Sequence, residues 1–147
     1  MKISTKGRYG LRIVLDVALN QEKGPVILRD IAHRQGISEK YLWQVINPLK
    51  SAGLVNSVRG ARGGYVLARS PHAISIRDIV SILEGPVSLV ACVSSPDACQ
   101  RSPACVVREA WSQIETRLND AMREITLKDL IQKQKEREAS RTPNYMI

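Results

Sequence analysis

The chain has 147 residues, of which 44% are apolar, which is enough for one small domain with a core and an appendage. It carries a formal net charge of +8, and no stretch stays apolar for the ~18 residues that a membrane-spanning helix needs. The N-terminus also lacks an apolar signal run, so we expect a cytoplasmic protein with no membrane partner.

The positive charge is concentrated in the N-terminal part of the chain. Residues 1–91 hold 13 Lys and Arg against 6 Asp and Glu, whereas residues 92–147 hold 9 against 8. This asymmetry indicates that the first part meets a polyanion such as nucleic acid, although a merely basic, well-solvated surface would have the same composition.

Three helices are predicted at the start of the chain. The first covers residues 9–20, where apolar side chains recur at helical spacing: Leu11, Val14, Leu15 and Ala18. A short second helix covers residues 26–34 and ends before the turn at Gly36. Ser38 is then placed to cap a third helix, with Glu39 in its first turn where a negative charge suits the helix dipole.

A β-hairpin and a fourth helix are predicted next. Two β-prone runs flank the glycine-rich tip formed by residues 59–64, which is the pattern of a hairpin. The sequence Ser75-Ile76-Arg77-Asp78 is a capping box that starts the fourth helix. Gly85-Pro86 ends it.

The C-terminal part combines a loop with a long helix. Residues 86–105 hold three Pro and three Cys and predict an irregular loop. From residue 106 apolar residues return at spacings of three and four, as in a helix that packs on a partner helix: Val107, Trp111, Ile114, Leu118, Ala121 and Ile125. A last short helix should run to about residue 135, followed by a polar, frayed tail.

These elements predict a mainly α fold with a small β-hairpin wing. Residues 1–85 form a winged helix-turn-helix DNA-binding domain and residues 86–105 a cysteine loop. Residues 106–135 form a dimerisation helix region, and residues 136–147 a polar tail. We therefore expect a homodimer that binds a double-stranded DNA operator.

The third helix carries the predicted base-reading residues. Its N-terminal end can enter a major groove about 12 Å wide, and its candidate contacts are Ser38, Lys40, Tyr41 and Gln44. Gln44 can make two hydrogen bonds to adenine, whereas Lys40 and Tyr41 can contact phosphate. Alternatively, Tyr41 and Trp43 pack within the protein, although Trp43 is expected to be partly exposed.

The wing supplies two further candidates, Arg59 and Arg62. Glycines around them allow the backbone to approach DNA closely, and arginine is favoured in a narrow minor groove. The alternative is that both are ordinary solvated loop charges.

All three cysteines lie in one short segment with the spacing Cys92-x6-Cys99-x5-Cys105. Thiolates are soft ligands that suit iron–sulfur clusters and zinc. A structural zinc site usually has four protein ligands in short paired spacings, so zinc is less favoured. A thiol–disulfide switch, or three unrelated cysteines, would also fit this spacing.

At this point the sequence resembles the IscR-type transcription regulators, whose relatives include the nitric-oxide sensor NsrR. The matching stretches cover about residues 1–135: Lys6-Gly7-Arg8-Tyr9, Leu15 to Asn20, Asp30-Ile31-Ala32, Arg34 to Ser38, Tyr41-Leu42, Gly53-Leu54-Val55, Ser57 to Gly60, Gly63-Gly64-Tyr65, the three cysteines and Trp111. The resemblance is specific, because the DNA-reading motif and the cysteine triplet occur together in the same order.

The resemblance implies a homodimeric repressor of cluster-assembly genes that senses cluster status through a [2Fe–2S] cluster, with [4Fe–4S] as the alternative. It implies Cys92, Cys99 and Cys105 as the ligands. It also implies DNA contacts at four positions: Lys40, Tyr41, Gln44 and Arg59.

Two positions depart from that pattern. Arg108 stands where the family pattern has a histidine, so the fourth ligand is open. Its candidates are His33, Asp97, Glu84, Glu109, a partner-chain group or a small exogenous molecule. Trp43 replaces a glutamate implicated in choosing between DNA site classes, which puts that two-mode behaviour in doubt.

Other functions are less well supported by the sequence. A nitric-oxide or redox sensor, or a cluster-free thiol-based regulator, is the alternative within the same class. An electron-transfer protein would not need the basic N-terminal part. No enzyme is predicted, because Gly60-x-x-Gly63-Gly64 lacks the Lys-Ser/Thr of a nucleotide cradle.

Overall fold

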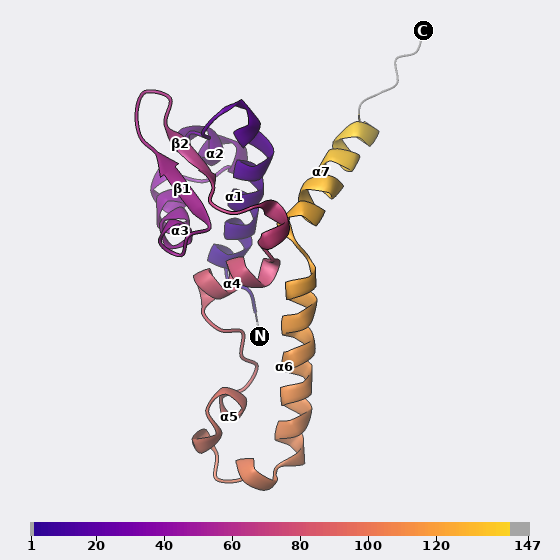
Figure 1. The fold of residues 1–147 in the computed structure, drawn as a ribbon. Coiled ribbons are helices and arrows are strands. Elements are labelled where there is room, and N and C mark those ends of the chain that lie inside the picture. The colour runs from indigo at the N-terminus through magenta and orange to yellow at the C-terminus, as the bar shows by residue number, and fades with distance from the viewer. Residues whose placement is uncertain (1, 142–147) are drawn as a thin grey trace.

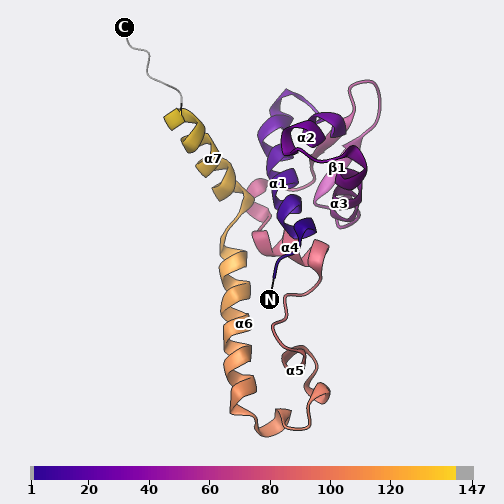
Figure 2. The same cartoon turned by 180° about the vertical axis from the view of Figure 1, so that it is seen from behind.

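The computed structural model describes residues 2–141 of the chain. Helices and strands follow in the order α1 (Thr5–Asn20), α2 (Leu28–Gln35), α3 (Glu39–Ser51), β1 (Val55–Val58), β2 (Gly64–Leu67), α4 (Ile76–Glu84), α5 (Ala91–Ser94), α6 (Val106–Glu124) and α7 (Leu127–Arg141). Helices α1–α4 and the hairpin form a body, from which residues 86–124 extend as an arm (Figures 1 and 2). This architecture confirms the predicted winged helix fold class.

Helix α1 lies at the centre of the body. The Ser4 hydroxyl caps it by accepting a hydrogen bond from the Gly7 N–H. Its fully buried side chains are Ile13, Val14 and Val17, whereas three of the four residues predicted to face the core are only partly buried. The buried face of α1 differs from the predicted one because several elements contact this helix, namely α2, α3, α4 and α7.

The close packing of α1 on α4 depends on a glycine. A Cβ added at Gly10 would lie 2.0 Å from Cδ1 of Leu83, on α4. Real Cβ atoms do not approach other atoms so closely, so a larger residue here would have to displace the Leu83 side chain. Helix α4 itself begins with the predicted capping box, in which Ser75 and Asp78 each accept a backbone hydrogen bond from the other.

Helix α2 begins two residues later than predicted. Val26 instead forms an isolated bridge to Tyr65, with N···O distances of 2.9 and 2.8 Å between the two backbones. This pairing attaches the segment before α2 to the wing. Ile27, which precedes α2, is consequently 44% exposed.

The wing is a two-stranded antiparallel sheet. Strands β1 and β2 pair from Val55 opposite Leu67 to Val58 opposite Gly64. Gly63 closes the tip, because a Cβ there would lie 2.2 Å from the Val58 carbonyl oxygen. The hairpin predicted from the sequence is therefore confirmed, including the need for glycine at its tip.

Two C-terminal features differ from the expectation. The segment 86–105 is not wholly irregular, because it holds α5 and two short 3₁₀ turns, at Pro96–Ala98 and Ser102–Ala104. Helix α7 continues to Arg141, so residues 136–141 are helical rather than frayed. Pairs of side chains spaced i and i+4 support this extension, with Gln132 bonded to Glu136 and Gln134 to Glu138. The remainder of the predicted tail, residues 142–147, lies outside the described residues.

Helix α6 runs along the arm and buries none of its residues in this single chain. None of the described helices is long and apolar enough to span a bilayer.

Candidate nucleic-acid interface and cysteine loop

The N-terminal end of α3 presents the predicted base-reading residues. Ser38 is exposed, and its hydroxyl accepts the Tyr41 N–H at 3.1 Å, so that side chain caps the helix. Lys40 and Gln44 are also exposed and lie one helical turn apart on the same face. On the opposite face, core packing fixes the helix through four buried residues: Leu42, Val45, Ile46 and Leu49.

The two aromatic residues of α3 have different surroundings. Tyr41 is half-buried and meets the ring of Tyr9 edge-on, with the centroids 5.9 Å apart and the planes at 84°. Trp43 is 54% exposed, as expected from the sequence. Tyr41 therefore packs partly within the protein, which was the alternative to a DNA contact, whereas Trp43 does not.

Arg59 and Arg62 lie at the wing tip, and both are exposed. Among the described residues neither makes a hydrogen bond or ion pair, so both guanidinium groups are available to phosphate or base edges. The structure thus places the six predicted DNA contacts on the third helix and on the wing, the two elements from which a winged helix reads a duplex.

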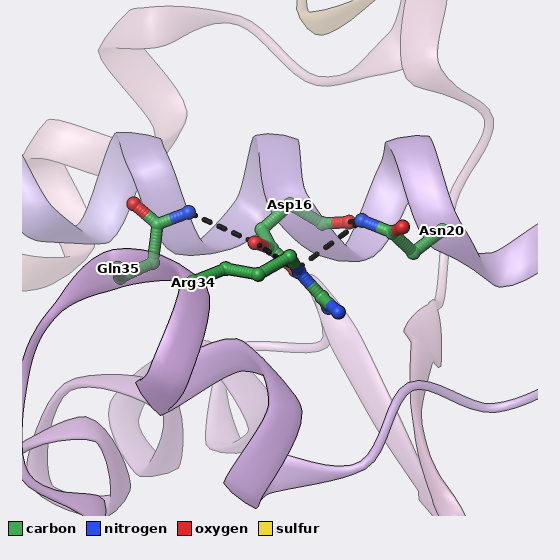
Figure 3. A network of polar contacts seen from close by, with 4 residues as sticks. All are labelled: Asp16, Asn20, Arg34 and Gln35. Carbon is green, nitrogen blue, oxygen red and sulfur yellow. Dashed lines mark hydrogen bonds and ion pairs between the residues drawn. The ribbon is translucent and has the colours of Figure 1, made fainter.

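A network around Asp16 attaches α1 to the helix-turn-helix, and the sequence analysis missed it. Figure 3 shows the Asp16 carboxylate of α1 between Arg34 and Gln35 of α2. Its side chain is 3% exposed, and it accepts bonds from Arg34 Nη2 at 2.6 Å and from Gln35 Nε2 at 2.8 Å. The hydrogen bond to Asp16 raises the pKa of Arg34 above its ordinary value. An aspartate between the apolar runs 13–15 and 17–19 was the available signal.

This network continues to the recognition helix. Gln35 Oε1 accepts from Arg12 Nε at 2.9 Å. The Arg12 guanidinium lies 5.0 Å from the centroid of Tyr9, which in turn meets Tyr41. Polar and aromatic contacts therefore link α2 through α1 to the N-terminal end of α3.

The cysteine loop brings its three thiols to the far end of the arm. Cys92 lies on α5 and is half-buried, Cys99 is exposed, and Cys105 caps the N-terminus of α6. The Cys105 Sγ accepts the Arg108 N–H at 3.4 Å.

Arg108 joins the two ends of this loop. Its Nε donates to the Cys92 carbonyl oxygen at 2.7 Å, while its own backbone N–H contacts Cys105. Its side chain also lines a cavity of about 460 Å³ together with Asp97, Cys99, Gln100 and Ser102. Arginine at this position thus holds the loop, a role that a histidine ligand could not fill in the same way.

The loop carries three thiols on one segment, and thiolates are the soft ligands that hold iron–sulfur clusters. Within residues 2–141 no three His, Cys, Asp or Glu side chains converge closely enough to hold a single metal ion. Of the fourth-ligand candidates within the chain, Asp97 shares a cavity with Cys99, whereas Glu84 is occupied by Ser4 of the N-terminal segment.

The reading helix, the wing and the appended cysteine arm define a winged helix-turn-helix DNA-binding regulator. A family model described as Rrf2, iron-dependent transcriptional regulator, matches residues 3–133. The chain therefore belongs to the Rrf2 family of DNA-binding transcriptional regulators. This result confirms the resemblance to the IscR-type regulators.

Two regulators with different names are among its relatives. The transcriptional regulator CymR of Bacillus subtilis (strain 168) is 44% identical over 130 residues, which are 88% of this chain and 89% of CymR. IscR of Escherichia coli O1:K1 / APEC is 40% identical over 134 residues, which are 91% of this chain and 82% of IscR.

IscR and CymR proteins are also among the similar solved structures. IscR of T. potens superimposes with a TM-score of 0.76 at 39% identity, covering 99% of this chain and 96% of that protein. CymR, described as the global cysteine regulator of B. subtilis, superimposes with a TM-score of 0.75 at 42% identity, covering 90% and 97%.

Proposed function

We propose that this chain is a homodimeric repressor that binds operator DNA and regulates genes of iron–sulfur cluster biogenesis. In this proposal a [2Fe–2S] cluster on Cys92, Cys99 and Cys105 reports cluster status. One observation carries it: the three thiols lie at the end of an arm whose long helix has an exposed apolar face and leads back to the DNA-reading body.

The exposed face of α6 supports dimerisation. On this helix the side chains of Val107, Trp111 and Ile114 are 58%, 41% and 48% exposed, and all three fall on the stripe predicted from the sequence. A second copy of the same helix is the partner that such a heptad-like stripe fits. Pairing the arms would set the spacing of two recognition helices, which dimeric readers need near one DNA turn or a multiple of it, about 34 Å.

The contacts of α6 with the body supply a route from the loop to the DNA. Arg77 of α4 donates to the Asn119 side chain of α6 at 3.0 Å. Helix α4 in turn packs against α1 and α3. A change in the arm therefore reaches the recognition helix through packed elements rather than through a flexible linker.

Loading would draw the three thiols together. The Cys105 thiol accepts the Arg108 N–H at the start of α6, and the Arg108 side chain donates to the Cys92 carbonyl oxygen, so Arg108 already joins two of the three cysteines. Because Cys99 is exposed, the segment around it must close over the other two thiols. When bound, the cluster would supply a labile, redox-active centre that orders this segment.

A second candidate is a cluster-free regulator that senses thiol oxidation or cysteine supply. Two observations favour it, namely the arginine at the expected fourth-ligand position and the exposed thiol of Cys99. The similar protein CymR is described as the global cysteine regulator of B. subtilis, which also supports a cluster-free regulator.

Iron and acid-labile sulfide per monomer, measured after strictly anaerobic purification, distinguish these two functions. About two of each, together with a visible absorption spectrum, support the [2Fe–2S] sensor, and about four of each would indicate [4Fe–4S]. The Cys92→Ala variant should lose the cluster and derepress the target genes. The control variant Ser94→Ala, on the same short helix, should keep the cluster and still repress. Iron-free protein after reconstitution, or full repression by Cys92→Ala, would contradict the proposal.

A further inference from the structure

The exposed face of α3 carries more candidate base contacts than the sequence analysis assigned to it. A helix that lies along a major groove can read bases with side chains spaced i, i+3, i+4 and i+7, because these share one face. In α3 that spacing selects Lys40, Trp43, Gln44 and Asn47, and all four are exposed. Two of them, Trp43 and Asn47, are not among the DNA contacts predicted from the sequence.

Two of the predicted contacts on α3 are partly engaged within the protein. The Ser38 hydroxyl caps the helix, and the Tyr41 ring is half-buried against another aromatic ring. By contrast, within residues 2–141 the side chains of Lys40, Gln44 and Asn47 make no hydrogen bond or ion pair. The free polar groups of this face therefore extend farther along the helix than the sequence analysis placed them.

Trp43 is the side chain of this face that gains most from a partner. It is 54% exposed, and among the described residues its ring contacts no other ring and no cation. An exposed indole keeps a large apolar area in water, and contact with another apolar group removes that area from water. In the major groove, the apolar group that side chains meet is the C5-methyl group of thymine.

Asn47 adds hydrogen-bonding groups one turn farther along α3. It lies four residues after Trp43, which is about 6 Å along the helix axis at 1.5 Å per residue. That distance is about two base-pair steps of 3.4 Å. The carboxamide has both an acceptor and donors, the combination that matches N6 and N7 of adenine. The two side chains are therefore spaced for neighbouring A·T pairs.

The charges around this face favour DNA over a protein as its partner. Helix α3 exposes Lys40 and Lys50 and has one acidic residue, Glu39. Arg59 and Arg62 of the wing also make no hydrogen bond or ion pair within the part of the chain that the structure describes. A polyanion meets these free cations at the same time as the apolar and amide groups between them.

We propose that Trp43 and Asn47 complete the base-reading stripe of α3 and make it specific for A·T pairs. Asn47 makes two hydrogen bonds to N6 and N7 of one adenine. Trp43 contacts the methyl group of a thymine within about two base pairs of that adenine. The inference rests on the proposed function only through its operator binding, and it does not depend on a cluster.

Selection of binding sites from a random double-stranded DNA library by the full-length protein tests this stripe. Relative to the wild-type motif, Asn47→Ala should lose the preference for adenine at one position, and Trp43→Ala the preference for thymine at another. The other positions should keep their preferences, because each base contact acts locally. Arg117→Ala, on the exposed face of the arm, is the control and should select the wild-type motif. Each variant is prepared anaerobically in the same way, with its iron content measured.

Base analogues in the selected motif test the two contacts atom by atom. Deoxyuridine in place of the thymine removes only the methyl group and should weaken wild-type binding roughly fourfold, as expected for one buried methyl group. Adenine replaced by 7-deazaadenine loses only the N7 acceptor, which should weaken binding roughly fivefold. Trp43→Ala should be indifferent to the first change, and Asn47→Ala to the second.

A switch of preference separates base reading from support of the helix. Asn47→Asp keeps the size of the side chain but has only acceptors, so the preferred base should change from adenine to cytosine, whose N4 is a donor. A merely structural residue would lower affinity evenly and leave the motif unchanged. A wild-type motif in all the Trp43 and Asn47 variants would overturn the inference while leaving operator binding intact. Failure of the wild-type protein to enrich any motif would overturn the inference and the proposed function together.

Discussion

The body and the arm use the same apolar residue types in opposite ways. In the body Leu42, Ile46 and Leu49 of α3 are at most 1% exposed, and burial of each such side chain is worth about 1.5–3 kcal/mol. In the arm Val107 and Ile114 of α6 are 58% and 48% exposed. The body therefore buries its apolar side chains within the chain, whereas the apolar stripe of the arm is left exposed to a partner.

The comparison also separates constant from variable parts. Helix α3, which carries the predicted base contacts, is held by four buried side chains, and α2 is attached to α1 by the Asp16 network. The thiols are held by one 3₁₀-rich segment and by Arg108. The proposed sensing role fits this difference, because a segment held by few contacts can be ordered by what it binds.

Leu42→Ala should produce the largest effect. It removes a fully buried side chain from the centre of the body and should lower the free energy of unfolding by about 2–5 kcal/mol. Chemical denaturation followed by circular dichroism measures this change.

Ile114→Ala is the matched change in the arm. It should alter the unfolding of the body by no more than about 0.5 kcal/mol, yet it should weaken self-association in sedimentation equilibrium. Equal destabilisation of the body by both variants would remove the proposed distinction between the two regions.

Arg59→Ala should have the next largest effect, on binding rather than on folding. Loss of a DNA-contacting arginine should cost about 1–3 kcal/mol of operator affinity at physiological salt. Arg117→Ala removes the same charge from the arm and is the control. Indistinguishable operator affinities for the two variants would exclude Arg59 from the interface.

Asp16→Ala should destabilise the body by an intermediate amount. It leaves Arg34 without its carboxylate, and since the Arg34 side chain is 38% exposed, solvent reduces the cost to about 1–2 kcal/mol. Leu15→Ala, at the preceding position of α1 and only partly buried, is the comparison for lost packing alone.

The pH dependence of this ion pair follows from Arg34. Because its pKa is raised in the folded state, the pair's contribution is fully present below the ordinary arginine pKa and is lost only as the pH rises through the folded value. The Asp16–Arg34 contribution, measured as the difference between wild type and Asp16→Ala, should therefore stay constant from about pH 6 to pH 9.

The smallest effect should occur at the start of α7. Hydrogen bonds from the backbone and hydroxyl of Thr126 lower the pKa of Asp129. Their contribution is present above the ordinary aspartate pKa and is lost as the pH falls through the lower folded value. Asp129→Asn should accelerate amide exchange over residues 127–131 slightly at neutral pH, and the difference from wild type should vanish in acid.

Sequence patterns predicted much of the body. Ser38, Ser75 and Asp78 were assigned as helix caps because their hydrogen bonds are local, and the structure contains those bonds. Long-range contacts were inaccessible to the same patterns. The bridge from Val26 to Tyr65, which shortens α2, joins residues that no local pattern relates.

The residues of the candidate site also fall into those that sequence patterns identify and those that only the structure reveals. The three cysteines and the residues of α3 were found by their type and spacing, whereas the structure added the Asp16 network and the cavity beside Cys99. The burial of the Ser102 hydroxyl, which has no hydrogen-bond partner among the described residues, also had no signal in the sequence.

By itself the sequence determined which residues could cap, pair and ligate, because capping, turn formation and thiol chemistry depend on near neighbours along the chain. Only the tertiary structure decided which apolar faces are buried. It also decided that Arg108 joins Cys92 to Cys105 and that Asp97 shares a cavity with Cys99 without pairing with Arg108. The physical reason is that burial and charge separation depend on distances between segments far apart in the chain, and packing alone sets those distances.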